Sequence, residues 1–258
     1  MMEDKKLVSQ YLDEIEDRHG VKILFAYGDG INKNIGRPEE EPAYTVGCII
    51  HDDYSNEGLN ITKGQYTFVG LNIETFIASY YVTPYSCAEI YKSPSIYRVY
   101  PGMDELFRVM MELINTEMVL EECLTVTRNR LIDLLEDPMV NMFFMDEIMR
   151  MIVIYNNIIE TESVTFIDHE KSISMSMRYI SHDILTKMSA PLVNTNDPFK
   201  SYRIDDEVIL WLAAQVLYMR KNNETAVKGN EKSMKALIAV DNVYNERILT
   251  PIKMASQN

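Results

Sequence analysis

The sequence predicts an α+β protein in which a small mixed β-sheet is followed by a largely helical part. Before about residue 72, short apolar runs are separated by glycine-containing and acidic loops, which is typical of strands joined by turns. After that point, apolar residues recur every three or four positions, which is typical of amphipathic helices. We therefore divide the chain into residues 1–100 and 101–258. No linker composition separates the two parts, so they can share one core.

The first part begins with a helix and continues with strands. Leu7, Tyr11 and Ile15 lie at helical spacing with charged residues between them, and Gly20 is suited to end that helix. The predicted elements are a helix over 3–18, strands over Val21–Tyr27, Ala43–His51 and Ile61–Leu71 with Gly64 as a bend, and loops over Ile31–Pro42 and Asp52–Gly58.

From Asn72 onward the predicted structure is helical. Phe76 and Tyr80 belong to one apolar face, Pro84 interrupts it, and Ser93–Pro94 ends the next helix. Beyond residue 100, the predicted helices cover Met103–Asn115, 116–136, 138–160, 168–188, 205–221 and 229–250. Two prolines and two asparagines predict a loop over Pro191–Tyr202.

The charge of the chain limits the partners that we expect. The formal net charge is −14 and the isoelectric point is about 4.8. Nucleic-acid binding requires a basic surface that neutralises phosphates, so general binding of DNA or RNA is not expected. A single basic pocket within an acidic body, or a protein partner with a basic surface, is compatible with this balance.

The cysteines and the N-terminus indicate a reducing compartment. Cys48, Cys87 and Cys123 are far apart and form no paired framework, which favours buried thiols. The N-terminal residues are charged rather than apolar, so no signal peptide is expected, and no run of 18 apolar residues predicts a membrane span. We therefore expect a cytoplasmic protein that does not associate with membranes.

Two sequence segments carry a family resemblance. Lys22–Gly30 reads KILFAYGDG, and Glu39–Ile50 reads EEEPAYTVGCII. This layout of a strand, a glycine turn and a second strand resembles the nucleotidyltransferase superfamily with its DNA polymerase beta-like fold. It is most similar to the bacterial and phage branch of predicted nucleotidyltransferases. In that family the second strand opens with Asp-x-Asp, whose carboxylates hold magnesium ions; the matching positions here are Ala43 and Thr45.

The resemblance extends further along the chain. The family has a third carboxylate shortly before a glycine, and Thr67 occupies that position ahead of Gly70. The family also has an Asn-Pro-x-x-x-x-Glu segment that ends in Ser-Pro. Here Thr83–Pro84, Glu89 and Ser93–Pro94 follow at matching spacing.

The resemblance also implies candidate nucleotide-binding residues. A family helix carries Lys, a His four residues later and an Arg seven residues after the Lys; here Lys171 and Arg178 are kept, and Met175 replaces the His. Residues at i and i+7 share one helix face, which in relatives looks towards the phosphates. Backbone N–H groups of Gly28, Asp29 and Gly30 could also hold a phosphate, although a tight turn alone explains the glycines.

The missing carboxylates decide the expected chemistry. Phosphoryl transfer depends on metal ions that are held by anionic oxygens, and neither alanine nor threonine supplies one. We therefore expect no catalytic residues, no metal site and no cofactor. Mg²⁺ would be required only if other acids replace the lost ligands, and the candidates for that role are Asp29, Asp52, Asp53, Glu39, Glu40 and Glu41.

Three functions follow from the sequence. The first is a non-catalytic nucleotidyltransferase-like protein that binds a protein or a nucleotide, with self-association left open. The resemblance to phage proteins suggests a host-modulating or anti-defence role in the host cytoplasm. The second is an active nucleotidyltransferase with relocated metal ligands, which would transfer a nucleoside monophosphate from a nucleoside triphosphate. The third is an unrelated helical interaction or structural protein.

Methionine and tyrosine bear on the choice between binding and packing. The chain has 17 methionines and 16 tyrosines, with clusters over 139–151 and 80–100. Such clusters can form adaptable contact surfaces, but the same spacing serves a buried helix face.

Overall fold

The computed structural model describes residues 2–28, 44–51, 58–93, 95–136, 139–140, 142–167, 169–194, 202–226 and 230–255. It confirms the predicted order of a mixed sheet followed by helices. The chain forms two compact units, which we call unit 1 (Met1–Leu113 with Met234–Asn258) and unit 2 (Ile114–Ser233). This division differs from the predicted one at residue 100, because the C-terminal segment returns to the sheet-containing unit.

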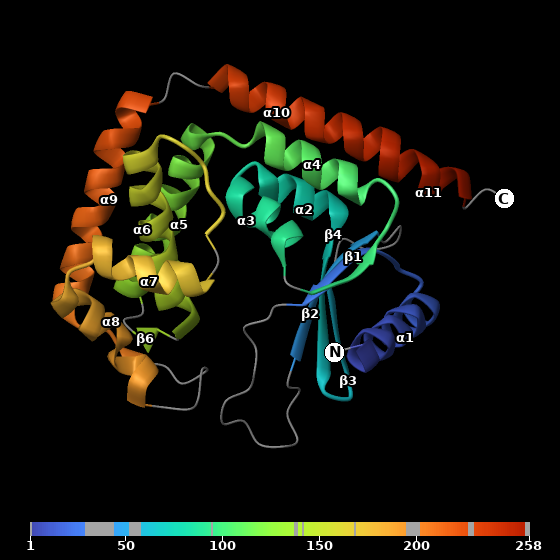
Figure 1. Ribbon diagram of the computed structural model, residues 1–258, viewed down its shortest axis with the longest axis horizontal. Helices are drawn as coiled ribbons and strands as arrows, with labels where there is room; N and C mark the ends of the chain where they lie inside the picture. Colours follow the sequence, from blue (N-terminus) through green and yellow to red (C-terminus); the bar gives the residue numbers. More distant parts are fainter. Residues whose placement is uncertain are drawn as a thin grey trace. The chain divides into compact units, whose positions relative to one another are not determined.

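The sheet of unit 1 has the strand order β3-β4-β2-β1-β5 (Figure 1). The strands β2 and β4 run parallel, and every other neighbouring pair is antiparallel. The bounds of the strands are β1 Lys22–Gly28, β2 Tyr44–His51, β3 Leu59–Lys63, β4 Tyr66–Asn72 and β5 Ser95–Val99.

One prediction about the strands was wrong. The segment predicted as a single bent strand is the hairpin of β3 and β4. Gly64 has a φ of +56° and takes part in the turn between them. Glycine adopts this left-handed conformation without a steric penalty, so the chain reverses there instead of bending. The edge strand β5 was not predicted at all.

Helix α1 (Met2–His19) covers one face of the sheet. Its residues Val8, Leu12 and Ile15 are fully buried, and successive strand residues alternate between this face and the opposite one. Two exposed carboxylates of α1 are also tied to the sheet, because Arg98 contacts Asp13 and Lys63 contacts Glu14. The sheet residues packed against α1 are Ile23, Ala26, Val46, Cys48, Ile50, Leu59, Tyr66 and Phe68.

Helices cover the opposite face (Figure 1). They are α2 (Ile73–Tyr80), α3 (Pro84–Glu89), the 3-10 turn η1 (Ile90–Lys92) and α4 (Met103–Leu113). The change from strand to helix at Asn72 is confirmed, because its side chain caps α2 by accepting from the backbone N–H of Glu74 at 2.9 Å. Phe107 of α4 lies at the centre of an aromatic cluster on this face, together with Phe25, Phe76 and Tyr91.

The C-terminal segment packs on unit 1. It consists of α10 (Asn230–Val243), the π-helical segment η2 (Tyr244–Leu249) and α11 (Thr250–Ala255), and it runs beside α4 in Figure 1. The hydroxyl of Tyr81 donates to Asp241 at 3.0 Å, and Arg247 pairs with Glu105 at 3.0 Å.

Unit 2 is a helical bundle in which α5 packs against α6 and α9. Its helices are α5 Thr116–Glu136, α6 Met142–Thr161, α7 His169–Tyr179, α8 His182–Asn194 and α9 Asp206–Ala226. Three details differ from the prediction. The single helix predicted over 168–188 is two helices, α7 and α8, because the chain leaves the helical conformation at Ile180 and Ser181. Met139–Val140 forms a short strand, β6, that pairs with β7 (Tyr202–Arg203), and α8 continues past Pro191 to Asn194.

A buried polar network joins three helices of unit 2. The hydroxyl of Tyr155 on α6 lies 3.2 Å from both Asn223 Oδ1 and the carbonyl oxygen of Met219 on α9. The amide of Asn223 donates to the carbonyl oxygen of Leu120 on α5 at 3.1 Å. Burial raises the pKa of Tyr155 to about 12, so this hydroxyl keeps its proton at alkaline pH values at which an ordinary tyrosine begins to ionise.

Candidate functional site

Three threonines of neighbouring strands form a row across the sheet, and two of them, Thr45 and Thr67, are positions at which the family resemblance expects carboxylates. Thr45 of β2 and Thr67 of β4 are directly paired residues on parallel strands, and Thr62 of β3 is paired with Thr67. Paired residues of neighbouring strands point to the same face of a sheet. The hydroxyl oxygens of Thr62 and Thr67 are 3.3 Å apart, which is within hydrogen-bonding distance.

This threonine row is electrically neutral. A hydroxyl is a weak ligand for Mg²⁺ in comparison with a carboxylate, and the hydroxyl of Thr67 already has a hydrogen-bonding neighbour in Thr62. Thr62 was missed by the sequence reasoning, because it was placed within a single bent strand and not opposite Thr67. The fourth position of interest, Ala43, lies outside the described residues, as do Glu39, Glu40, Glu41, Asp52 and Asp53.

The space above Gly47, two residues after Thr45 on β2, is filled by an aromatic ring. Tyr27 and Gly47 are paired residues of β1 and β2. A Cβ atom at position 47 would lie 2.3 Å from Cζ of Tyr27, so the ring occupies the space above the glycine. The surface beside Thr45 is therefore formed by a tyrosine ring and by backbone.

Gly28 is explained by packing against β5. It ends β1, and a Cβ atom at this position would lie 2.9 Å from the ring of Tyr97 and 3.2 Å from Cβ of Ser95. Its carbonyl oxygen accepts a hydrogen bond from the hydroxyl of Ser93. Asp29 and Gly30, the other two residues of the predicted phosphate-binding turn, lie outside the described residues.

The contact between Ser93 and Gly28 joins two segments that carry the family resemblance. Gly28 belongs to the first motif, and Ser93 ends the second motif, which begins at Thr83–Pro84. Pro84 is the first residue of α3, where its fixed φ favours a helix start and its missing N–H costs no hydrogen bond. The number of residues between Pro84 and Ser93 in the second motif is thus set by the combined length of α3 and η1.

The predicted basic residues lie on α7 in unit 2. Lys171 and Arg178 are both exposed. Arg178 pairs with Glu160 of α6 at 2.7 Å, and its guanidinium lies 5.5 Å from the centre of the Tyr179 ring. Gly28 belongs to unit 1, whereas Lys171 and Arg178 belong to unit 2.

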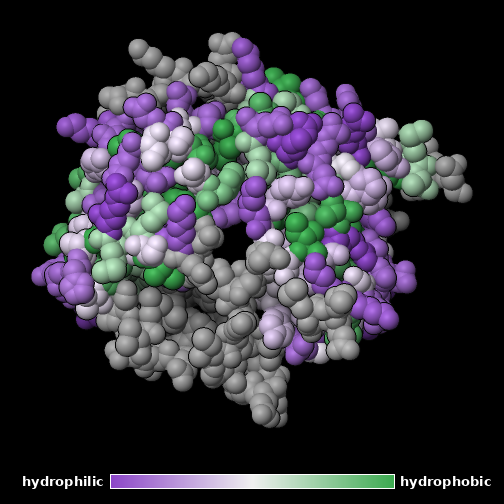
Figure 2. Space-filling model, in the orientation of Figure 1, coloured by the Kyte–Doolittle hydropathy of each residue, from purple (hydrophilic) through white to green (hydrophobic). Residues whose placement is uncertain are grey.

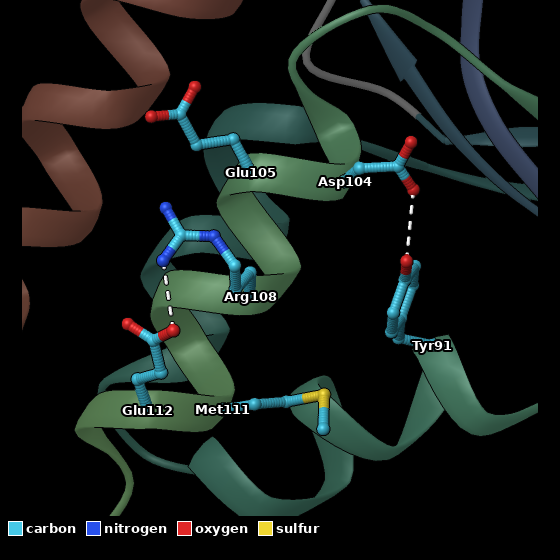
Figure 3. A pocket seen from close by; sticks show the side chains of 6 residues that line it. All are labelled: Tyr91, Asp104, Glu105, Arg108, Met111 and Glu112. Atoms are coloured by element: carbon cyan, nitrogen blue, oxygen red, sulfur yellow. Dashed lines mark hydrogen bonds and ion pairs between the residues drawn. The ribbon is translucent and has the colours of Figure 1, made fainter.

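A surface hollow lies between η1 and α4 of unit 1 (Figure 3). Figure 3 shows Asp104 directed towards Tyr91, and Arg108 directed towards Glu112. The residues that line the hollow are Tyr91, Asp104, Glu105, Arg108, Met111 and Glu112.

Each carboxylate of this hollow already has a donor. Asp104 accepts from the Tyr91 hydroxyl at 3.0 Å, and that hydrogen bond raises the pKa of Tyr91. Glu112 pairs with Arg108 at 2.9 Å. Glu105 pairs with Arg247 at 3.0 Å. Because the charges are locally balanced in this way, the hollow does not resemble a site with a perturbed acid or base that is poised for proton transfer.

All three cysteines lie in the interior of this fold. Cys48, Cys87 and Cys123 are all buried. Burial raises the pKa of Cys48 to about 12 and that of Cys123 well above its ordinary value. Because the thiolate is the nucleophilic form, neither thiol is activated.

Within the described ranges, no group of three or more His, Cys, Asp or Glu side chains is arranged to hold a metal ion. None of the helices in the described part of the chain has the length and apolar character that crossing a bilayer requires.

A comparison of the chain with protein-family models returns no match, and none of the curated proteins matches it.

Proposed function

We propose that this chain is a nucleotidyltransferase-like protein that does not transfer phosphoryl groups and acts by binding a protein or a nucleotide. The observation that carries the proposal is the direct pairing of Thr45 with Thr67 on parallel strands. These are two of the three positions at which the family resemblance expects metal-binding carboxylates. Side chains on one face of neighbouring strands are close enough to share an ion, but here both are neutral.

The energetic reason is the charge of the metal centre. Two divalent ions and a triphosphate gather many charges in a small volume, and anionic ligands are needed to hold the ions in position. A threonine pair supplies none of this negative charge. Binding without turnover is therefore the activity that such a sheet surface supports best. A host-modulating or anti-defence role in the cytoplasm would be one use of such binding, and it rests on the resemblance alone.

The first experiment restores the lost charge. The triple variant Ala43→Asp/Thr45→Asp/Thr67→Asp is compared with the wild-type protein and with a matched variant that has Asn at the same three positions. We expect Mn²⁺ to raise the melting temperature of the aspartate variant only, because bound metal relieves the repulsion between its clustered carboxylates. Absence of a Mn²⁺ effect in a folded aspartate variant would contradict the assigned positions.

The second experiment tests catalysis directly. Wild-type protein is incubated with labelled ATP or GTP and with Mg²⁺ or Mn²⁺, and we expect no transfer of label. Transfer that disappears in Asp29→Asn, Asp52→Asn or Asp53→Asn variants would establish the alternative, an active nucleotidyltransferase with relocated metal ligands.

A third experiment separates nucleotide from protein as the bound partner. A nucleotide at about 100 times its dissociation constant stabilises a protein by about 2.7 kcal/mol, which a thermal-shift measurement detects. If nucleotide binds, Lys171→Ala and Arg178→Ala should remove the shift, whereas Glu160→Gln should not, because it leaves Arg178 charged. A lack of any nucleotide shift would leave a protein as the partner, to be captured from a host extract.

A further inference from the structure

One side of helix α9 carries an exposed apolar stripe. The buried side, with Val208, Leu212 and Met219, faces the bundle, where α9 packs against α5. On the other side, Leu210 is 70% exposed and Leu217 is 66% exposed. These residues are seven apart, which places them on one helix face. In Figure 1, α9 lies at the edge of the helices of unit 2.

The stripe is continuous along the helix. Ala214 lies between the two leucines and is exposed, and Tyr218 beside Leu217 is 42% exposed. The face of the molecule in Figure 2 is mostly hydrophilic, and its hydrophobic side chains form separate areas. Exposed stripes of large apolar side chains commonly mark interaction sites.

One charged residue lies at each end of the stripe, and the two charges have opposite signs. Asp206 lies in the first turn of α9, and Lys221 lies near its other end. Both residues are exposed. Each of them is four residues from the nearest leucine of the stripe, so both share its face. The stripe is thus acidic at its N-terminal end, apolar in the middle and basic at its C-terminal end.

Followed from either end, the stripe has the same order of residue types: a charged residue, a leucine, small alanines, a leucine and a charged residue. Only the signs of the two charges differ between the two directions. Counted outward from the midpoint between Ala213 and Ala214, Leu210 and Leu217 lie at equal distances, and so do Asp206 and Lys221. A two-fold axis through that midpoint would place each leucine against the other, and each carboxylate against an ammonium group. The small alanines at the axis allow two helices to approach closely.

We propose that this chain forms a homodimer through antiparallel packing of α9 against α9 of a second copy. A two-fold interface requires a self-complementary surface, and the stripe meets that requirement in both polarity and charge. A parallel arrangement would place Asp206 against Asp206 and Lys221 against Lys221, which is unfavourable. The large negative charge of the whole chain opposes association only weakly, because salt screens exposed charges beyond about 10 Å.

The first test measures the oligomeric state of the full chain by sedimentation equilibrium. We expect a concentration-dependent dimer that Leu210→Lys/Leu217→Lys weakens by about 100-fold or more, because charged groups would enter the apolar centre. The matched control is Ile132→Lys/Leu135→Lys on α5, where Leu135 is 65% exposed, and the dimer should persist. A wild-type chain that stays monomeric at all concentrations overturns the proposal.

The second test exchanges the charges. Asp206→Lys alone places four ammonium groups at the two ends of the interface, and Lys221→Asp alone places four carboxylates there. Each single variant should bind itself about tenfold more weakly. The double variant should regain dimerisation, and an equimolar mixture of the two single variants should form a heterodimer. Equal self-association of all four proteins rules out the antiparallel pairing.

The third test fixes the position of the axis by cross-linking. The natural cysteines are buried, so an introduced surface thiol is the reactive one. Ala214→Cys lies next to the axis and should form an intermolecular disulfide under mild oxidation. Lys221→Cys should not, because its two copies would be separated by about 22 Å along the helices, far beyond disulfide distance. Cross-linking at residue 221 but not at 214 overturns the antiparallel arrangement. Circular dichroism of each variant checks that α9 is still folded.

Discussion

The ring of Tyr27 occupies the space that a side chain at position 47 would need. Cβ of an alanine at this position would lie 2.3 Å from Cζ of Tyr27, which is far shorter than a van der Waals contact. We expect Gly47→Ala to lower the free energy of unfolding by about 1–3 kcal/mol, because the ring must leave its packed position. Urea denaturation followed by circular dichroism measures this change.

A double-mutant cycle separates the clash from other effects of the alanine. If the ring is the cause, Gly47→Ala should cost clearly less in a Tyr27→Ala background than in the wild-type protein. An equal cost in both backgrounds would show that the glycine is required for another reason. The same variants also alter the surface beside Thr45, so they are useful controls for the metal-restoration experiment.

The hydroxyl of Tyr155 is the second testable feature. Tyr155→Phe leaves Asn223 with one hydrogen bond fewer inside the bundle, and we expect a loss of about 1 kcal/mol of stability. The sole tryptophan, Trp211, belongs to α9 in the same unit, so its fluorescence reports the unfolding of that unit. Tyr218→Phe is the matched control, because this tyrosine is partly exposed, and its effect should be close to zero.

Cys48 makes stability depend on alkaline pH. Burial is the main cause that raises the pKa of its thiol from 9.0 to about 12, and the charge of Arg98 opposes the shift. The unfolded chain therefore loses this proton at a lower pH than the folded chain does. The stabilising contribution is complete below pH 9.0 and is lost as the pH rises towards 12.

The expected slope is a loss of at most about 1.4 kcal/mol per pH unit from this one group. A Cys48→Ala variant lacks the group, so its stability should fall less steeply than that of the wild-type protein above pH 9. The packing cost of the substitution does not depend on pH and cancels in the slope. Parallel curves for the two proteins would mean that the folded thiol ionises normally.

The local structure of the sheet was largely predictable from the sequence. Val21–Tyr27 and Ala43–His51 were predicted as strands, and the structure has Lys22–Gly28 and Tyr44–His51. These strands are apolar and bounded by turn residues, so the signal lies within a few neighbouring positions. β5 was missed because Ser95–Val99 is a short edge strand whose first four residues are half-buried, and such a strand has no clear alternation.

The arrangement of the candidate site was less accessible. The sequence reasoning aligned Thr45 and Thr67 with family positions, but their direct pairing depends on the register of two strands between which β3 lies in the sequence. The role of Gly28 depends on the approach of Tyr97 from β5, which a local pattern does not reveal. The return of η2 to unit 1 is likewise a long-range contact, and helical periodicity gives the buried face of a helix but not its neighbour.

The attachment of the C-terminal segment to unit 1 can be tested at Ile248. This residue of η2 is fully buried, so Ile248→Ala should cost about 2–5 kcal/mol through lost apolar contacts and the cavity that remains. Met254→Ala is the matched control on α11, because Met254 is 64% exposed and its truncation should change stability by less than about 0.5 kcal/mol.

Circular dichroism reports the unfolding of both units, whereas Trp211 fluorescence reports unit 2 alone. If Ile248→Ala shifts only the transition seen by circular dichroism, the segment stabilises unit 1 and the two units unfold separately. Equal shifts of both signals would show that they unfold as one cooperative structure, and no shift of either would contradict the burial of Ile248 in unit 1.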